Sequence, residues 1–157
     1  MLSELLSTER VRVPLGSHSK ADLLRELIHL ALPGAGAEQL DGVIAAVEAR
    51  EAAVSTAMGG GLAVPHGRTD LVSEVCLAAG LVEGVDDYAA PDGLPVRVVF
   101  LVLTPRNASA KHVKVLSRIA RLMHDRDSKA ALLSVRTAEE FTGVLRHADG
   151  VRAALLS

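Results

Sequence analysis

The sequence has very few aromatic residues and a single cysteine, and both scarcities exclude classes of function. Aromatic residues make up only 2% of the 157 residues, so a surface that stacks single-stranded nucleic acid is not expected. The one cysteine, Cys76, cannot form an internal disulfide, and no Cys/His spacing typical of a zinc site occurs. Because Cys76 lies within an apolar run, we expect it to be buried as a small hydrophobic residue.

An excess of charge and a long hydrophobic run are also missing. The net charge is −2 at pH 7, so no overall basic surface predicts nucleic-acid binding. No stretch approaches the ~20 apolar residues that cross a bilayer. The N-terminus lacks the basic segment and apolar run of a signal peptide. We therefore expect a soluble, cytoplasmic protein without direct membrane insertion.

The composition that remains is that of an ordinary globular protein. Hydrophobic residues account for 49% and charged residues for 23%, and the length suits a single domain over residues 1–157. Strands are predicted at 10–15, 74–82 and 96–104. Helices are predicted between Ser19 and Pro33, at 37–49, at 108–124 and from Thr137 onward. Strands that alternate with amphipathic helices indicate an α/β sandwich of helices around a central sheet.

Residues 50–68 carry the most specific chemical signal. The motif Arg-Glu-x-x-x-Ser-Thr begins at Arg50, three glycines follow at 59–61, and the run Leu-Ala-Val-Pro-His-Gly contains His66. Proline fixes its own φ and disfavours helix before it, and the glycine after the histidine permits a turn. We therefore expect the imidazole to lie on a bend at the end of a strand, where α/β proteins usually bind ligands.

This contiguous stretch resembles the enzyme IIA proteins of the fructose/mannitol/nitrogen type, which belong to the bacterial phosphoenolpyruvate phosphotransferase system. The resemblance runs from about residue 10 to residue 147. It implies a mixed central β-sheet of about five strands sandwiched between α-helices, and a phosphotransferase that works through a phosphohistidine intermediate. It also implies that the HPr phosphocarrier protein phosphorylates His66, and that the group then passes to a cysteine of a sugar-specific IIB component.

A second histidine, His112, lies in the segment His-Val-Lys-Val-Leu, which resembles the helix that carries the family's second histidine. His112 precedes Val115 and Leu116 by three and four residues, so it should share their apolar face and point inward. On spacing alone, a satisfied histidine at a helix start is the simpler interpretation. The resemblance instead implies that His112 donates to the phosphoryl oxygens and orients His66.

Phosphoryl transfer to histidine needs a neutral imidazole and nearby groups that stabilise negative charge on the phosphoryl oxygens. Arg50 continues the apolar stripe of its helix. On spacing alone, the simpler interpretation of Arg50 is a cation that interacts favourably with the C-terminus of a helix. The resemblance instead assigns Arg50 to the site. Ser55 and Thr56 offer hydroxyls, and the glycine run, Gly61 included, offers backbone N–H groups that bind anions. These residues complete the expected phosphoryl-binding set.

No cofactor and no metal are expected, because the chain lacks the phosphate-binding glycine motifs of nucleotide sites and has no cluster of acids for magnesium. The leading hypothesis, which the resemblance implies, is a phosphocarrier that supports carbohydrate uptake. The alternative is a nitrogen-type regulatory IIA protein, whose phosphorylation state switches binding to partner proteins. A metal-dependent hydrolase using His66 and His112 is disfavoured, because carboxylate ligands are not apparent.

Overall fold

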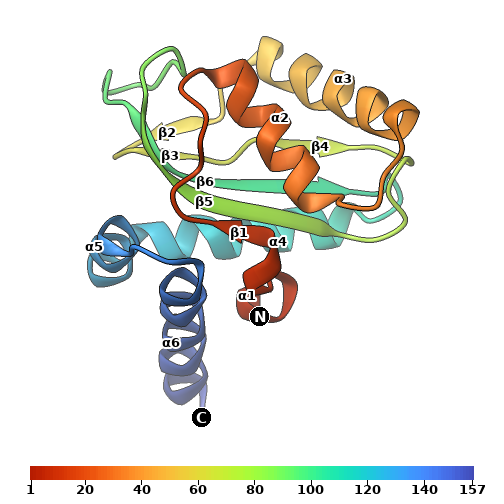
Figure 1. Cartoon of the computed structure of the whole chain (residues 1–157). Coiled ribbons are helices and arrows are strands. Elements are labelled where there is room, and N and C mark those ends of the chain that lie inside the picture. The colour runs from red at the N-terminus through yellow and green to blue at the C-terminus, as the bar shows by residue number, and fades with distance from the viewer.

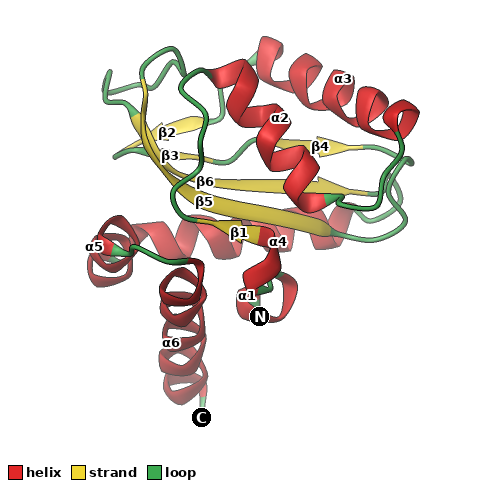
Figure 2. Ribbon diagram, viewed as in Figure 1, coloured by secondary structure: helices red, strands yellow, loops and turns green.

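The computed structural model describes residues 1–157 and contains a six-stranded mixed β-sheet between two layers of helices (Figures 1 and 2). The strands are β1 (Val11–Arg12), β2 (Ala57–Gly59), β3 (Leu62–Ala63), β4 (His66–Arg68), β5 (Cys76–Val85) and β6 (Val96–Thr104). Their order is β1-β5-β6-β3-β2, and β4 also pairs with β6. The predicted fold class is confirmed, with one strand more than the five expected.

Helices cover both faces of the sheet. They are α1 (Leu2–Leu5), α2 (Lys20–Ala31), α3 (Ala37–Ala53), α4 (Ser109–His124), α5 (Arg126–Ser134) and α6 (Ala138–Leu156), with a short 3₁₀ helix at Thr8–Arg10. In Figure 1, α2 and α3 lie on one side of the sheet, and α1, α4, α5 and α6 lie on the other. None of these helices is long and apolar enough to cross a membrane.

The sheet separates two apolar clusters, one under each helical layer. β6 supplies both of them, because successive residues of a strand point to opposite faces. Val99, Leu101 and Leu103 join the cluster beneath α2 and α3, whereas Phe100 and Val102 join the cluster beneath α4, α5 and α6. Burial on both faces explains why the sequence of β6 is almost continuously apolar.

Several local predictions are confirmed at the helix starts. The Ser19 side chain accepts a hydrogen bond from the Asp22 N–H and caps α2, and Thr137 caps α6 through the N–H of Glu140. These bonds satisfy backbone donors that have no partner inside the helix. β6 has the bounds that the sequence predicts, and α4 begins one residue later than expected.

Other predictions need correction. The strand expected at 10–15 is reduced to the two residues of β1. Pro14, two residues beyond its end, has no N–H with which to continue the ladder. The helix expected to end at residue 49 continues to Ala53. Cys76 is half-buried rather than buried, because it is the first residue of β5, and its Sγ lies 3.5 Å from the Glu74 carbonyl.

The topology places two distant segments at the same end of the sheet. β4 runs parallel to β6, with His66 opposite Val102 and Arg68 opposite Thr104. β6 ends at Thr104, and the chain enters α4 five residues later. The start of β4 and the first turns of α4 therefore meet at the carboxyl end of β6, which is the position where open sheets bind ligands.

Candidate functional site

His66 is the first residue of β4, just after the break at Pro65, rather than the last residue of a strand. Its side chain is partly buried, and Nδ1 lies 2.8 Å from the Val64 carbonyl oxygen. A carbonyl can only accept a hydrogen bond, so Nδ1 carries the proton and donates it. In the neutral ring, Nε2 is therefore left with a free lone pair.

His112 lies in the first turns of α4 and is buried, as its helical spacing predicts. Its ring meets that of His66 in an edge-to-face arrangement, with 5.3 Å between the centroids and 62° between the planes. On its other side, Nδ1 lies 2.7 Å from Oγ1 of Thr104. The structure thus brings the two predicted histidines into direct contact.

The surroundings of His112 favour its neutral form. Burial lowers the pKa of the imidazole, and the electrostatic influence of the adjacent His66 ring and of the cationic Arg68 and Arg50 lowers it further. An uncharged imidazole has one N–H to donate and one nitrogen to accept. Near pH 7, His112 can therefore donate a hydrogen bond without carrying charge.

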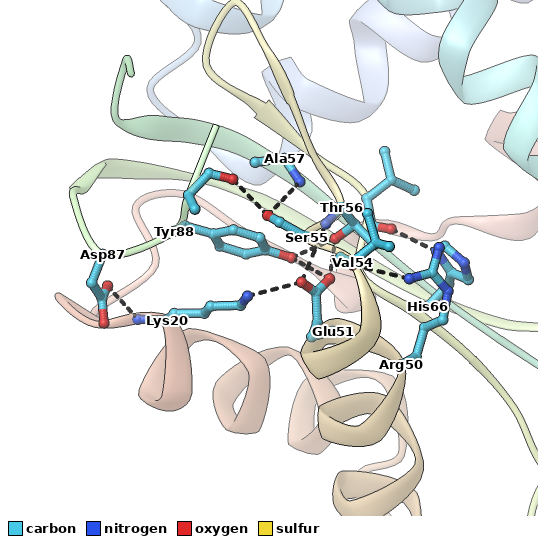
Figure 3. Close-up of polar contacts among 12 residues, drawn as sticks. Lys20, Arg50, Glu51, Val54, Ser55, Thr56, Ala57, His66, Asp87 and Tyr88 are labelled. Atoms are coloured by element: carbon cyan, nitrogen blue, oxygen red, sulfur yellow. Dashed lines mark hydrogen bonds and ion pairs between the residues drawn. The ribbon is translucent and has the colours of Figure 1, made fainter. Parts of the chain in front are cut away.

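Arg50 lies in the last turn of α3, and its side chain is partly exposed. Nη1 donates to the Val54 carbonyl oxygen at 3.0 Å, which holds the guanidinium against the segment that follows the helix. In Figure 3, Arg50 and His66 lie at the same end of the network drawn. The positive charge of Arg50 also contributes to the lowered pKa of His112.

The two predicted hydroxyl residues have partners elsewhere. The Ser55 hydroxyl donates to the Ala89 carbonyl at 2.6 Å. The Thr56 hydroxyl contacts the Glu51 carboxylate and lies 2.6 Å from the Tyr88 hydroxyl. Figure 3 shows both groups on the side of Tyr88 rather than beside the His66 ring. The structure therefore does not direct these hydroxyls to the imidazole pair.

Gly61 is also separated from the histidines. Its carbonyl accepts from the Val98 N–H on β6, whereas His66 pairs with Val102 farther along the same strand. Four residues of extended strand span roughly 13 Å. The positive φ of Gly61, 82°, fits the turn between β2 and β3, where glycine is the residue that adopts this backbone region readily. The structure thus uses Gly61 in a turn and does not bring it to the paired rings.

A buried polar network beside the site was not predicted. The Glu51 carboxylate accepts from the Thr56 N–H at 3.2 Å and from the Tyr88 hydroxyl at 2.7 Å, and it forms an ion pair with Lys20 at 2.9 Å. The Lys20 ammonium also lies 4.4 Å from the centroid of the Tyr88 ring. The only sequence signal for Glu51 is its place directly after Arg50 in the motif.

The network keeps each member in a defined protonation state. Burial raises the pKa of Glu51, but the hydrogen bonds from Thr56, Tyr88 and Lys20 together outweigh it, and the resulting pKa is below the ordinary value. Burial raises the pKa of the Tyr88 phenol, so it stays protonated and donates. The network joins α2, α3 and residues 54–56, and so supports the segment that holds Arg50.

The site combines a nucleophile with positive charge and hydrogen-bond donors. Nε2 of His66 carries a free lone pair, His112 offers a second neutral imidazole, and Arg50 offers a guanidinium. No group of three or more His, Cys, Asp or Glu side chains is arranged to hold a metal ion. This arrangement suits attack on an anionic group whose charge must be stabilised by protein donors.

Comparisons with solved structures agree with this fold. The crystal structure of nitrogen regulatory protein IIA-Ntr from Neisseria meningitidis superposes with a TM-score of 0.82 at 32% identity, covering 92% of this chain and 98% of that one. The NMR structure of the Escherichia coli complex of enzyme IIAMtl and phosphorylated enzyme IIBMtl gives 0.75 at 20% identity, covering 91% and 99%. The second likeness concerns the fold alone.

Sequence comparisons identify the family. A mannitol-specific phosphotransferase enzyme IIA component of Staphylococcus aureus is 31% identical over 152 residues, which cover 94% of this chain and 99% of that protein. Residues 4–148 match the family described as "Phosphoenolpyruvate-dependent sugar phosphotransferase system, EIIA 2". That match spans nearly the whole chain, and the chain therefore belongs to the EIIA 2 family of this phosphotransferase system.

Proposed function

We propose that residues 1–157 act as a single-domain phosphocarrier that takes a phosphoryl group from phosphorylated HPr onto Nε2 of His66. The contact between His66 Nδ1 and the Val64 carbonyl carries this proposal, because it leaves Nε2 as the free nucleophile. The P–N bond to HPr breaks as the bond between phosphorus and Nε2 forms. The electron pair of the broken bond returns to the HPr nitrogen, and His66 keeps its proton on Nδ1.

Two neighbours lower the barrier to this transfer. The guanidinium of Arg50 and an N–H of His112 stabilise the negative charge that spreads over the phosphoryl oxygens. The 5.3 Å separation of the imidazole centroids and the short tether of Arg50 to Val54 support these roles. Ser55 and Thr56 have no part in the transfer proposed here, because their hydroxyls are engaged elsewhere. Gly61 has none either, because it lies in the turn beside Val98, four residues before the Val102 that pairs with His66.

From His66, the group passes in the cytoplasm to a sugar-specific IIB component for carbohydrate uptake. The mannitol-specific relative and the solved complex of a IIA protein with a phosphorylated IIB protein support this step. The second candidate is a regulatory protein whose phosphorylation switches binding to partner proteins. The 32% identity to nitrogen regulatory protein IIA-Ntr supports it. Both functions share phosphorylation of His66.

Incubation with phosphoenolpyruvate, enzyme I and HPr tests the shared step. We expect one acid-labile phosphate per chain, and its loss in a folded His66→Ala variant. His124→Ala, which changes an exposed histidine of α4, is the matched control and should be labelled normally. Full labelling of His66→Ala would contradict the proposal.

Addition of purified IIB components to the phosphorylated protein separates the two candidates. Transport requires that the label move to a IIB protein. The regulatory function requires instead a partner whose binding differs between the phosphorylated and unphosphorylated chains. Transfer to a IIB protein without such a partner would reject the regulatory candidate.

A further inference from the structure

We propose that Thr104 is a positioning residue for the phosphotransfer site: its hydroxyl donates to Nδ1 of His112 and holds this histidine as the Nε2–H tautomer. The inference rests on the proposed function and adds a residue that acts through His112 and whose hydroxyl has no hydrogen bond to His66. It follows from the hydrogen-bond requirements of one fully buried hydroxyl.

Thr104 has only one partner for its hydroxyl. The residue is completely buried at the end of β6, and its Oγ1 lies 2.7 Å from Nδ1 of His112. Oγ1 makes no other hydrogen bond. No buried side-chain nitrogen or oxygen in the protein lacks a partner, so this one bond is what satisfies Oγ1. The two possible directions of this single bond therefore have different costs.

If Nδ1 of His112 carried the proton and donated it, the hydroxyl hydrogen of Thr104 would have no acceptor. A buried donor without a partner is costly, whereas an oxygen that donates one bond leaves nothing unsatisfied but a lone pair. The favoured direction is thus from the hydroxyl to Nδ1. This direction puts the ring proton of neutral His112 on Nε2, and burial and the surrounding positive charges lower the pKa of His112 and favour that neutral form.

Nε2 of His112 is the ring nitrogen that remains free to bind a ligand. It has no hydrogen-bond partner in the protein, and no buried nitrogen lacks one, so Nε2 is accessible. His66 has the opposite tautomer, because its Nδ1 donates to the Val64 carbonyl. The two accessible nitrogens are therefore complementary: the His66 nitrogen attacks phosphorus, and the His112 nitrogen donates to a phosphoryl oxygen. No proton leaves His112 during the transfer.

NMR spectra that correlate the imidazole nitrogens with their ring hydrogens test the tautomers in the unphosphorylated protein. We expect the proton on Nε2 in His112 and on Nδ1 in His66. A proton on Nδ1 of His112 would overturn the proposal without any variant. This measurement does not involve HPr, so its result does not depend on the proposed function. The proposed function is tested separately, and it fails if His66 is not phosphorylated.

Thr104→Val tests the link to transfer, because valine keeps the branched shape and removes the hydroxyl. We expect a second, Nδ1–H form of His112 to appear and transfer from HPr to slow by roughly threefold to tenfold, the range for one neutral hydrogen bond. Thr104→Ser, which keeps the hydroxyl, should have the same His112 tautomer and the same transfer rate as the unmodified protein. Thr142→Val removes a buried hydroxyl of α6 and should change neither.

The outcomes are separable. A mixed tautomer together with slower transfer in Thr104→Val, reversed in Thr104→Ser, supports the proposal. An unchanged His112 spectrum in folded Thr104→Val overturns it. A mixed tautomer with an unchanged transfer rate overturns the link between the Thr104 hydroxyl and phosphotransfer.

Discussion

At the residue scale, two side chains of the same type acquire different chemistry from their neighbours. His66 is partly exposed and donates through Nδ1 to a backbone carbonyl, whereas His112 is buried and contacts the hydroxyl of Thr104. The first arrangement leaves a nucleophilic nitrogen free. The second favours an uncharged ring that donates. Neither property belongs to histidine in isolation, so substitutions at each position should have different effects.

Substitution of His112 should slow transfer without preventing it. In the proposed transfer, His112→Ala removes a hydrogen bond to a charged phosphoryl oxygen, so we expect the rate from HPr to fall by roughly one to two orders of magnitude. His112→Gln retains an N–H donor of similar reach and should lose less. Stopped-flow measurements on the three proteins provide the comparison. If folded His112→Ala transfers as fast as the unmodified protein, His112 only fills the core.

Arg50→Lys distinguishes a site residue from a helix-terminal cation. While Nη1 of Arg50 donates to the Val54 carbonyl, the other N–H groups of the guanidinium remain free for the phosphoryl group. The ammonium of a lysine lacks this planar arrangement of donors. We therefore expect transfer to slow by about tenfold, with little change in thermal stability. Equal transfer rates for the two proteins would reject the catalytic role. Arg25→Lys, at an exposed residue of α2, is the matched control.

Sequence patterns predict the site residues to different degrees. His66, His112 and Arg50 lie in local motifs; the structure brings the two histidine rings into contact and places Arg50 at the same end of the polar network as His66 (Figure 3). Ser55, Thr56 and Gly61 belong to the same motif, yet the two hydroxyls bond to other partners and Gly61 lies in a turn, which a one-dimensional pattern cannot specify. Thr104 was predicted only as the end of a strand, because its contact with His112 depends on the turn between β6 and α4.

At the scale of elements, the Glu51 network joins α2, α3 and the segment that leads to β2. Glu51 contacts Tyr88, 37 residues away in sequence, and Lys20 on a different helix. A buried carboxylate is costly unless it is paired and hydrogen-bonded. These distant partners explain why no local pattern predicted that Glu51 would be buried.

Glu51→Gln should destabilise the protein in a pH-dependent way. We expect the free energy of unfolding at pH 7 to fall by about 2–4 kcal/mol, because Lys20 loses its charged partner. The pKa of Glu51 is lowered from 4.5 in the folded protein. Its contribution is therefore complete above the unfolded pKa and is lost as the pH falls through the folded pKa. The gap between the two proteins should narrow on acidification.

Urea unfolding at pH 7 and at successively lower pH measures this gap. Glu48→Gln is the matched control, because Glu48 is an exposed residue of α3 in a long ion pair with Arg25, and its loss should cost less than about 1 kcal/mol. A gap that stays constant with pH, or no gap at pH 7, would contradict the account of Glu51.

Elements differ in how well the sequence predicts them. β6 and α4 were predicted within one residue, because a strand buried on both faces and an amphipathic helix have clear patterns. β2 and β4 have only three residues each, which is too short for a period to be recognised. The α5 segment was not predicted, and its only buried residue is Leu132.

At the scale of the whole molecule, the C-terminal end of α6 extends beyond the body formed by the sheet and its two helical layers (Figure 1). Every residue from 151 to 157 is exposed, and Leu155 and Leu156 are 83% and 79% exposed. Earlier in the same helix, Phe141 and Leu145 are buried against the sheet. Only the first part of α6 therefore contributes to the core.

Deletion of residues 151–157 should leave the domain intact. Because all seven residues are exposed and none belongs to either apolar cluster, we expect the free energy of unfolding to change by less than about 0.5 kcal/mol, with an unchanged rate of phosphoryl acceptance. Deletion of 141–157, which removes Phe141 and Leu145, should cost several kcal/mol. Urea unfolding measures both. A large loss of stability in the shorter deletion would mean that the end of α6 packs against the protein.

The central claim, that Nε2 of His66 is the phosphoryl acceptor, is tested most directly by NMR of the phosphorylated protein with ¹⁵N-labelled histidine. We expect phosphorus to couple to Nε2 of His66, and Nδ1 of the same ring to keep its proton and its bond to the Val64 carbonyl. Phosphorus on Nδ1 of His66, or on either nitrogen of His112, would contradict the account.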